Sequence, residues 1–350
     1  MHQAERTPAV PRKPPTVSAE SSLPAMLQFI IRRTVGAIVT LFLIGAATFF
    51  LFVAAPSDYA SLACGRDCSP ARLEDIREAL GLNLPIAQQF WDFMSGIVTG
   101  RDFPDGHCAA PCLGQSFYSG DMVFDTIMDR FPLTLSLTAG AMIVFLTVGI
   151  GAGMISAYRR GSAIDKAATG ASMVLSSMQI YFLGPIVLLI FVYSTGWVED
   201  PKYVPFTEDP FGWLAGLWIP MAVMATIFTA QYTRMARASL IEQLAEEHVR
   251  TARAKGMPKK YVFFRYAWRG SLIPIVTVLG IDLSALLGGG VVTEITFSLQ
   301  GIGRLAVQGA TTKDLPLTMG VMLFGAFFIL LLNILVDIVY AWIDPRVRLS

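Results

Sequence analysis

Long apolar runs are the feature that most constrains how this chain can fold. A helix needs about 20 apolar residues to cross the hydrocarbon core of a membrane, and six segments reach that length. Hydrophobic residues make up 54% of the chain and charged residues only 15%, whereas a soluble domain has about 25% charged residues. The sequence therefore predicts an all-α polytopic membrane protein with spans at 34–55, 133–158, 167–195, 213–235, 272–292 and 317–343.

Polar residues inside these runs mark candidates for a translocation path. Gln179 lies in the third run, Gln231 in the fourth and Asp282 in the fifth. Polar side chains are tolerated in a span where helices face one another or line a cavity. A charge at the centre of a span costs about 2.5–3.5 kcal/mol on insertion scales. We therefore expect these three side chains to border the path, and a buried polar contact between helices is the alternative for Asp282.

The charges between the spans predict the orientation of the chain. The segment 234–269 carries nine Lys or Arg and only three acidic residues, whereas the stretch 56–130 has five Arg and eleven acidic residues. Because basic loops stay in the cytoplasm, both termini are predicted to be cytoplasmic. The net charge of +1 gives no global basic field that would indicate a nucleic-acid partner.

The spans divide the chain into four parts. Residues 1–28 contain five prolines and no apolar core, which predicts a disordered cytoplasmic tail and not a signal peptide. Residues 29–55 form the first span, and residues 56–130 form an extracytoplasmic cap. Residues 131–350 form the core transmembrane domain, whose cytoplasmic loop is 234–270.

The cap is too long for a simple connection, so we expect amphipathic helices in it at 70–80 and 86–98, the second anchored by Phe90, Trp91 and Met94. Every cysteine of the chain lies in the cap, at Cys64, Cys68, Cys108 and Cys112. Restriction to the oxidising side of the membrane predicts disulfides, and all three pairings are open. A metal site that uses His107 beside Cys108 is the alternative.

The stretch 240–274 is the most informative cytoplasmic segment. Residues compatible with one helix face recur in it at helical spacing, at Ile241, Leu244, His248 and Ala252. Gly256 follows a basic residue, as at a helix C-terminus where the next residue takes a positive φ. Pro258 suits the first turn of another helix. The pattern predicts two short helices that meet at a sharp bend outside the membrane.

Several segments carry a resemblance to a known family. They are RTARAKG at 250–256, LGLNLPIAQQF at 80–90, RFPLTLSL at 130–137, GGGVVTEITFSLQGIGRL at 288–305 and NILVDIVYAWIDPRVR at 333–348. Together they resemble permease subunits of binding-protein-dependent ABC importers, especially the peptide branch, over most of residues 29–348. The chain departs from the family where Arg250-Thr251-Ala252 replace Glu-Ala-Ala, and where an insert with Cys108 and Cys112 enlarges the cap.

The resemblance implies the six-span fold of a type I ABC importer permease, and a coupling elbow that contacts a cytoplasmic ATPase. The elbow residues are Glu247, Arg250, Thr251, Ala252, Arg253, Ala254, Lys255 and Gly256. ATP and Mg²⁺ are expected on that ATPase, because none of this chain's seven lysines is followed by Ser or Thr as a Walker A motif requires. The chain is thus expected to be a transport subunit and not an enzyme, with no cofactor of its own.

The expected partners are a homologous second permease subunit in a heterodimer, one or two ABC ATPase subunits and an extracytoplasmic substrate-binding protein. The expected location is the lipid bilayer of a prokaryotic plasma membrane. Glu294 and Arg304 flank the glycine-rich outer segment and are candidates for an outer gate, with exposed loop charges as the alternative.

Peptide import is the function that the resemblance implies, and three alternatives stand beside it. The same machine could import a nickel chelate or glutathione, or the chain could be a proton-coupled carrier that uses Asp282 and Asp337. The carrier leaves the ordered basic elbow unexplained, and the chain has no inverted repeat. An aspartyl protease needs two carboxylates that share a proton, and neither aspartate lies in a GxGD motif.

Overall fold

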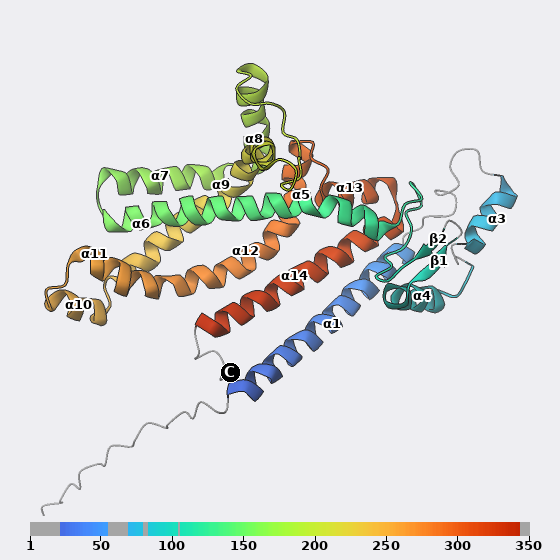
Figure 1. Cartoon of the computed structure of the whole chain (residues 1–350), viewed down its shortest axis with the longest axis horizontal. Helices are drawn as coiled ribbons and strands as arrows, with labels where there is room; N and C mark the ends of the chain where they lie inside the picture. The colour runs from blue at the N-terminus through green and yellow to red at the C-terminus, as the bar shows by residue number, and fades with distance from the viewer. Residues whose placement is uncertain (1–21, 55–68, 80–82, 104–105, 344–350) are drawn as a thin grey trace, which may run out of the picture.

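The computed structural model describes residues 22–54, 69–79, 83–103 and 106–343, which are mostly helical (Figure 1). Among these residues, five helices are long and apolar enough to span a membrane. Four of them lie in α1 (Ser22–Ala54), in α5 (Val123–Val144) continued through the π-helical turn η2 (Phe145–Gly149) by α6 (Ile150–Tyr158), in α9 (Pro210–Gln243) and in α14 (Leu315–Ile343). The fifth is Lys259–Leu283, which runs from α11 (Lys259–Val262) through the π-helical turn η4 (Phe263–Ala267) into α12 (Trp268–Thr296). A bent pair of helices makes a sixth candidate when its two arms are counted as one span.

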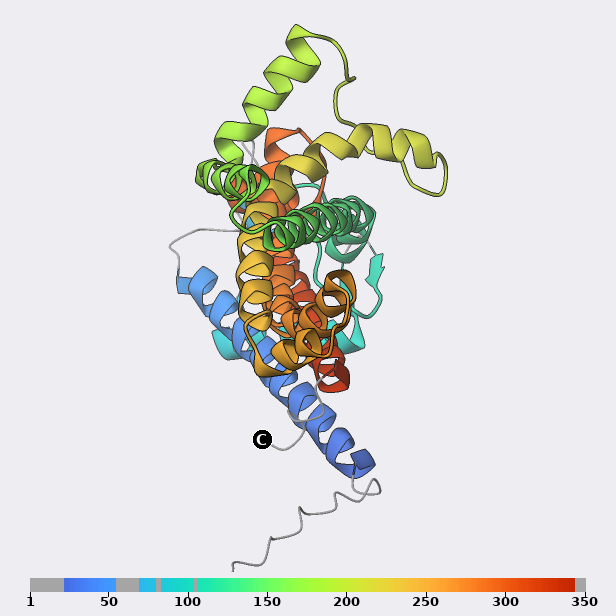
Figure 2. The same ribbon diagram turned by 90° about the vertical axis from the view of Figure 1, so that its left-hand side faces the viewer.

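That bent pair corrects the prediction of one continuous span at 167–195. It consists of α7 (Ala163–Ser177) and of α8 (Ile180–Val187) with the π-helical turn η3 (Leu188–Ser194), and the two arms meet at 100°. The Ser176 and Ser177 hydroxyls both donate to the carbonyl of Met173, a side-chain bond that competes with helix continuation. Gln179 then has an extended backbone, and α8 projects from the bundle (Figure 2).

Helix α9 lies at the centre of the bundle. It packs against α5, α6, α7 and α12, and α14 packs against α12 and α1. The main buried cluster includes Phe145 of η2 with Leu217, Met224 and Tyr232 of α9. Large apolar side chains on the outside, such as Leu51, are exposed, as expected where lipid replaces water as the solvent. The helix α9 is therefore both the packing core and the element that leads into the predicted coupling elbow.

The first helix begins earlier than the sequence indicated. The tail was predicted to extend to residue 28, but α1 already begins at Ser22. Pro24 lies in the first turn, where a missing N–H costs nothing because the first four N–H groups of a helix have no intrahelical acceptor. Residues 1–21 of the predicted tail lie outside the described residues.

The cap contains both helices that the sequence predicts, α3 (Pro70–Ala79) and α4 (Ile86–Thr99). Phe90 of α4 is buried against α1 and α14, and Met94 packs against the same cluster. Trp91, predicted as a third anchor, is 60% exposed, and its ring centroid lies 6.3 Å from that of Phe42 in α1. A short antiparallel hairpin of β1 (Arg101–Phe103) and β2 (Gly106–Cys108) completes the cap and was not predicted.

A single carboxylate ties the cap to the transmembrane bundle. Asp314, just before α14, is 1% exposed. It accepts hydrogen bonds from the Ser116 hydroxyl and from the backbone N–H groups of Phe117 and Leu317. Because a buried carboxylate needs several donors to offset its desolvation, this set fixes the end of the cap to the start of α14.

Candidate coupling surface and translocation path

The predicted coupling elbow is a short helix held against its neighbour by a small apolar core. Helix α10 (Glu247–Ala254) follows a three-residue break after α9, and α11 (Lys259–Val262) follows it. Val249 and Ala252 of α10 and Val262 of α11 are each at most 4% exposed and pack together. The elbow lies at one end of the bundle and the cap at the opposite end (Figure 1).

The break after α9 corrects the predicted helix face. Ile241 and Leu244 were expected to share that face with His248 and Ala252. Both pack against the cluster of Ala157 and Phe263 at the end of the bundle, and only Leu244 also packs against the elbow core around Ala252. His248 is exposed, and Val249 takes the inward position. Residues 244–246 belong to neither helix, so the helical spacing of α9 does not continue into α10.

The turn after α10 has the geometry that the sequence predicts. Gly256 has φ +77°, a conformation that costs other L-residues about 1–2 kcal/mol. Its N–H donates to the carbonyl of Arg253 at 3.0 Å. Pro258 precedes α11 as its capping residue, so the chain reverses sharply within four residues of Ala254.

The predicted coupling residues separate into an outer surface and an inner support. Glu247, Arg250, Thr251, Arg253, Ala254, Lys255 and Gly256 are exposed, whereas Ala252 is buried. The outer residues are available to a partner, and Ala252 can act only by shaping the elbow. Arg250 and Arg253 also line a hollow of about 390 Å³ together with Arg160 from the turn after α6, which concentrates positive charge at the base of the elbow.

A buried ion pair connects this end of the bundle, and the sequence analysis missed it. Asp165 of α7 accepts bidentate hydrogen bonds from Arg237 of α9, at 2.6 and 2.9 Å. It also accepts from the Ser156 hydroxyl and from the N–H of Gly161. From the sequence, Arg237 counts only as one of the basic residues of 234–269 that predict the orientation of the chain. Arg237 lies ten residues before α10 and Asp165 lies in the first turn of α7, and no spacing in the sequence connects the two.

The structure brings together two of the three predicted path residues. The Gln231 amide of α9 donates to the Asp282 carboxylate of α12 at 3.5 Å, and Asp282 is 8% exposed. This is the polar contact between helices that was the alternative interpretation of Asp282. Gln179 lies at the α7–α8 bend and is exposed. The polar centre of the bundle is therefore the Gln231–Asp282 pair. The side chain of Asp337, its suggested partner in a carrier, lies outside the described residues.

Glu294 holds the outer segment together. It is 0% exposed, so it is not an exposed loop charge. Its carboxylate accepts from the Thr134 hydroxyl at 2.7 Å and from the backbone N–H of Arg304 at 2.9 Å. A Cβ at Gly301 would lie 2.1 Å from a Glu294 oxygen, which explains the glycine there. The observed contact between the two predicted gate residues thus runs through the backbone of Arg304 and joins α5, α12 and α13 (Ile302–Thr312).

The cysteines of the cap form at least one disulfide, between Cys108 and Cys112. This bond excludes the two pairings in which Cys108 and Cys112 are joined to Cys64 and Cys68. Cys64 and Cys68 lie outside the described residues. His107 pairs with Asp102 at 2.5 Å, and the Cys108 sulfur is occupied by the disulfide. The alternative of a metal site built on His107 and Cys108 therefore does not fit this geometry.

Comparison with known proteins shows to which protein family this chain belongs. Residues 26–138 match the family model for the N-terminal part of a binding-protein-dependent transport system membrane component. Residues 149–349 match the model for the binding-protein-dependent transport system inner membrane component. The chain belongs to this family, the permease subunits of bacterial ABC importers.

Individual relatives come from the peptide branch of the family. A protein of Brucella abortus named as a peptide transport system permease is 35% identical over 92% of this chain and 99% of its own length. The dipeptide transport system permease DppB of Escherichia coli is 33% identical with the same coverage of both chains. The glutathione transport system permease GsiC of Escherichia coli is 32% identical, again over 92% and 99%.

Membership of the family defines the place of the chain in a larger machine. It is a multi-pass protein of the bacterial plasma membrane that works with a separate ATPase and a binding protein. The ATPase site belongs to the other subunit, consistent with the missing Walker A lysine.

Proposed function

We propose that this chain imports short peptides as one half of a heterodimer of two homologous permease subunits. The relatives named for peptides and dipeptides support this cargo class. Each chain offers one elbow, so two permease chains are needed to engage a pair of ATPase domains. Glutathione, a nickel chelate or another small solute is the alternative cargo for the same machine.

The exposed face of α10 is the proposed contact with the ATPase, and this surface is the observation that carries the proposal. It presents Arg250, Arg253 and Lys255 on a helix whose other side is fixed by Val249 and Ala252. A rigid helix with a defined exit turn can transmit a push, whereas a solvated loop cannot. The hollow beside Arg160 suits a carboxylate of the partner, because an arginine fork binds carboxylates in two-point contact.

Coupling then follows the chain from the elbow into the bundle. ATP and Mg²⁺, bound by the partner ATPase pair, draw the two elbows together when that pair closes. Only residues 244–246 separate α10 from α9, and α9 carries Gln231 to the centre of the bundle. The Asp165–Arg237 pair makes α7 move with α9. Movement of the elbow is thereby converted into a rocking of the spans between inward-open and outward-open states.

Asp282 is the proposed contact for the peptide amine within the path. It is 8% exposed, receives the long 3.5 Å contact from the Gln231 amide and lies beside the Tyr232 hydroxyl. A carboxylate with unused acceptor capacity in a low-dielectric setting attracts a cation strongly. Gln179 at the exposed bend is the proposed entrance to the same path, and Glu294 with Arg304 the fixed frame of its outer gate.

Both termini are proposed to be cytoplasmic. The first turns of α1 and the last turns of α14 lie toward the same end of the bundle as the elbow (Figure 1). The basic residues of 234–269 gather at that end, as the positive-inside rule requires.

The test is purification of the tagged chain from its native membrane in mild detergent, followed by reconstitution with the proteins that accompany it. Recovery of a second six-span permease and a P-loop ATPase, with ATP-dependent dipeptide uptake, is the expected outcome. A lone chain that drives uptake without ATP, and loses it when an uncoupler is added, would establish a proton-coupled carrier instead.

A further inference from the structure

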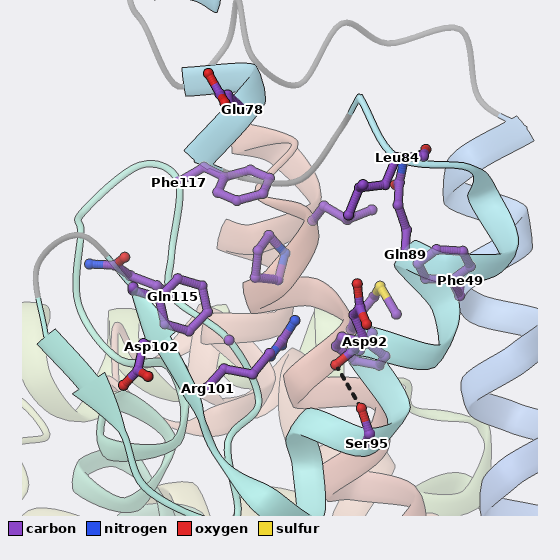
Figure 3. A pocket seen from close by; sticks show the side chains of 16 residues that line it. Phe49, Glu78, Leu84, Gln89, Asp92, Ser95, Arg101, Asp102, Gln115 and Phe117 are labelled. Carbon is purple, nitrogen blue, oxygen red and sulfur yellow. Dashed lines mark hydrogen bonds between the residues drawn. The ribbon is translucent and has the colours of Figure 1, made fainter. Parts of the chain in front are cut away.

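A hollow of about 400 Å³ lies on the outer face, between the cap and the outer ends of α1 and α14 (Figure 3). Its volume falls in the range of about 300–1,000 Å³ that is usual for small-molecule sites. Phe49, Phe93, Phe103, Phe117, Leu315 and Met319 form its apolar walls. The polar centre of the bundle at Asp282 does not contribute to it, so this is a second and separate candidate site.

Arg101 of β1 extends into this hollow, and its side chain is firmly positioned (Figure 3). The guanidinium lies 5.6 Å from the ring centroid of Phe93 and 5.4 Å from that of Phe103. Its Nε packs against Gly96, where an added Cβ would lie 2.3 Å away. Aromatic faces hold a guanidinium in place without using its hydrogen-bond donors, so the terminal nitrogens stay available.

Arg101 forms no ion pair with any carboxylate of the described residues. Within the described residues no carboxylate lies within 4 Å of it, and its buried Nε has no acceptor. Asp102, the adjacent carboxylate, is engaged with His107. Burial lowers the pKa of the Arg101 guanidinium, and the negative charge of Asp92 opposes that lowering. An arginine is still protonated at neutral pH, so Arg101 keeps a positive charge that no ion pair with a described carboxylate offsets.

Besides Asp102, two further acidic residues line the hollow, Asp92 and Glu78. Asp92 lies on the wall that α4 forms, and Glu78 lies at the far side of the hollow beyond Phe117 (Figure 3). Both side chains are exposed, and neither forms an ion pair with Arg101. A positive group, negative groups and apolar walls around one hollow match a zwitterion with an apolar side chain.

We propose that this hollow is an outer-face subsite for short peptides with a free C-terminus, in which Arg101 binds the α-carboxylate. Asp92 and Glu78 face the α-ammonium, and the aromatic walls take the side chains. The inference rests on the proposed peptide cargo and deepens it. The subsite would hold a peptide at the mouth of the permease before it enters the path near Asp282.

The probe is the dipeptide Ala-Phe, compared with its C-terminal amide, which lacks the negative charge. Binding is measured by isothermal titration calorimetry to the copurified transporter complex in nanodiscs, without the binding protein. The free acid is expected to bind at least about tenfold more tightly than the amide, the loss expected when one charge-assisted hydrogen bond is removed. This comparison uses the unmodified protein, so it does not depend on whether a variant folds.

Variants then locate the site. Arg101→Met should reduce binding of the free acid about tenfold, whereas Arg77→Met, an equal charge change on α3 outside the hollow, should leave it unchanged. Arg101→Lys keeps the charge and should bind with intermediate affinity. Equal binding of acid and amide, or loss of binding in Asp282→Asn but not in Arg101→Met, would overturn the subsite.

A parallel uptake assay separates this inference from the proposed function. The same complex, reconstituted with its binding protein and ATP, is tested for uptake of labelled Ala-Phe. If uptake proceeds but the complex alone fails to distinguish acid from amide, the subsite is wrong and peptide import stands. If acid binds through Arg101 but no peptide is taken up, the subsite stands and peptide import is wrong.

Discussion

Gly256 is the position at which the coupling hypothesis can be tested by one substitution. Its φ of +77° closes the elbow, and an added Cβ would meet nothing within 4 Å. The cost of Gly256→Ala is therefore confined to the backbone, at about 1–2 kcal/mol. That energy lowers the ratio of closed to open elbows about 5- to 30-fold.

Gly256→Pro acts more strongly on the same turn. Proline fixes φ near −65° and removes the N–H that donates to the Arg253 carbonyl, so the observed turn cannot form. In proteoliposomes we expect ATP-dependent peptide uptake to fall by at least about tenfold in Gly256→Pro and by less in Gly256→Ala. Membrane insertion and the basal ATPase rate of the partner should be unchanged.

Gly196 provides a matched control. It has φ +62°, an added Cβ there also meets nothing within 4 Å, and it lies between η3 and α9, outside the elbow. Gly196→Ala carries the same kind of backbone cost, so uptake should be nearly normal. Full uptake by Gly256→Pro would refute the reasoning, as would an equal loss in Gly196→Ala and Gly256→Ala.

Three further substitutions test other parts of the account. Glu294→Ala removes the buried acceptor of the Thr134 hydroxyl and the Arg304 N–H, at about 1–3 kcal/mol each. It should lower the apparent unfolding temperature in detergent, whereas removal of the exposed Glu208 should not; equal effects would contradict the buried role. Asp282→Asn should slow uptake of a dipeptide at least about tenfold, with Asp200→Asn as the exposed control, and an unchanged rate would exclude a contact with the amine. Cys108→Ser opens a short loop worth about 2 kcal/mol in the chain-entropy description and should make the cap more sensitive to protease. Thiol labelling of the unmodified protein at Cys108 or Cys112 without reductant would contradict the disulfide.

The parts of the fold that depend on local pattern were predicted from the sequence. Apolar runs locate the spans because lipid requires about 20 apolar residues in a row. The Gly256 turn was predicted because positive φ has a local signature. The helices α3 and α4 were predicted from their amphipathic spacing.

The parts that depend on tertiary contacts were not predicted. The 100° bend at Gln179 leaves composition unchanged, so hydropathy alone cannot distinguish it from a straight span. The inward position of Val249 in place of His248 follows from a break in the helix that resets its phase.

Buried carboxylates show the same limit. Glu294 and Asp314 are surrounded by donors from segments far away in the sequence, and no spacing rule connects such partners. The ion pair between Asp165 and Arg237 joins residues 72 positions apart. Sequence patterns thus placed the candidate coupling surface, whereas the structure was needed to show how it is attached to the bundle.

Cross-linking from the elbow tests the central claim most directly. Lys255→Cys places a thiol on the exposed face of α10, and Lys313→Cys places one beside α13 on the cap side of the molecule. A thiol–amine cross-linker is applied to native membranes with and without ATP and Mg²⁺. The account predicts an adduct between Lys255→Cys and a P-loop ATPase, with a yield that changes with ATP, and no such adduct from Lys313→Cys. Absence of an ATPase adduct from the elbow in membranes that still take up peptide would contradict it.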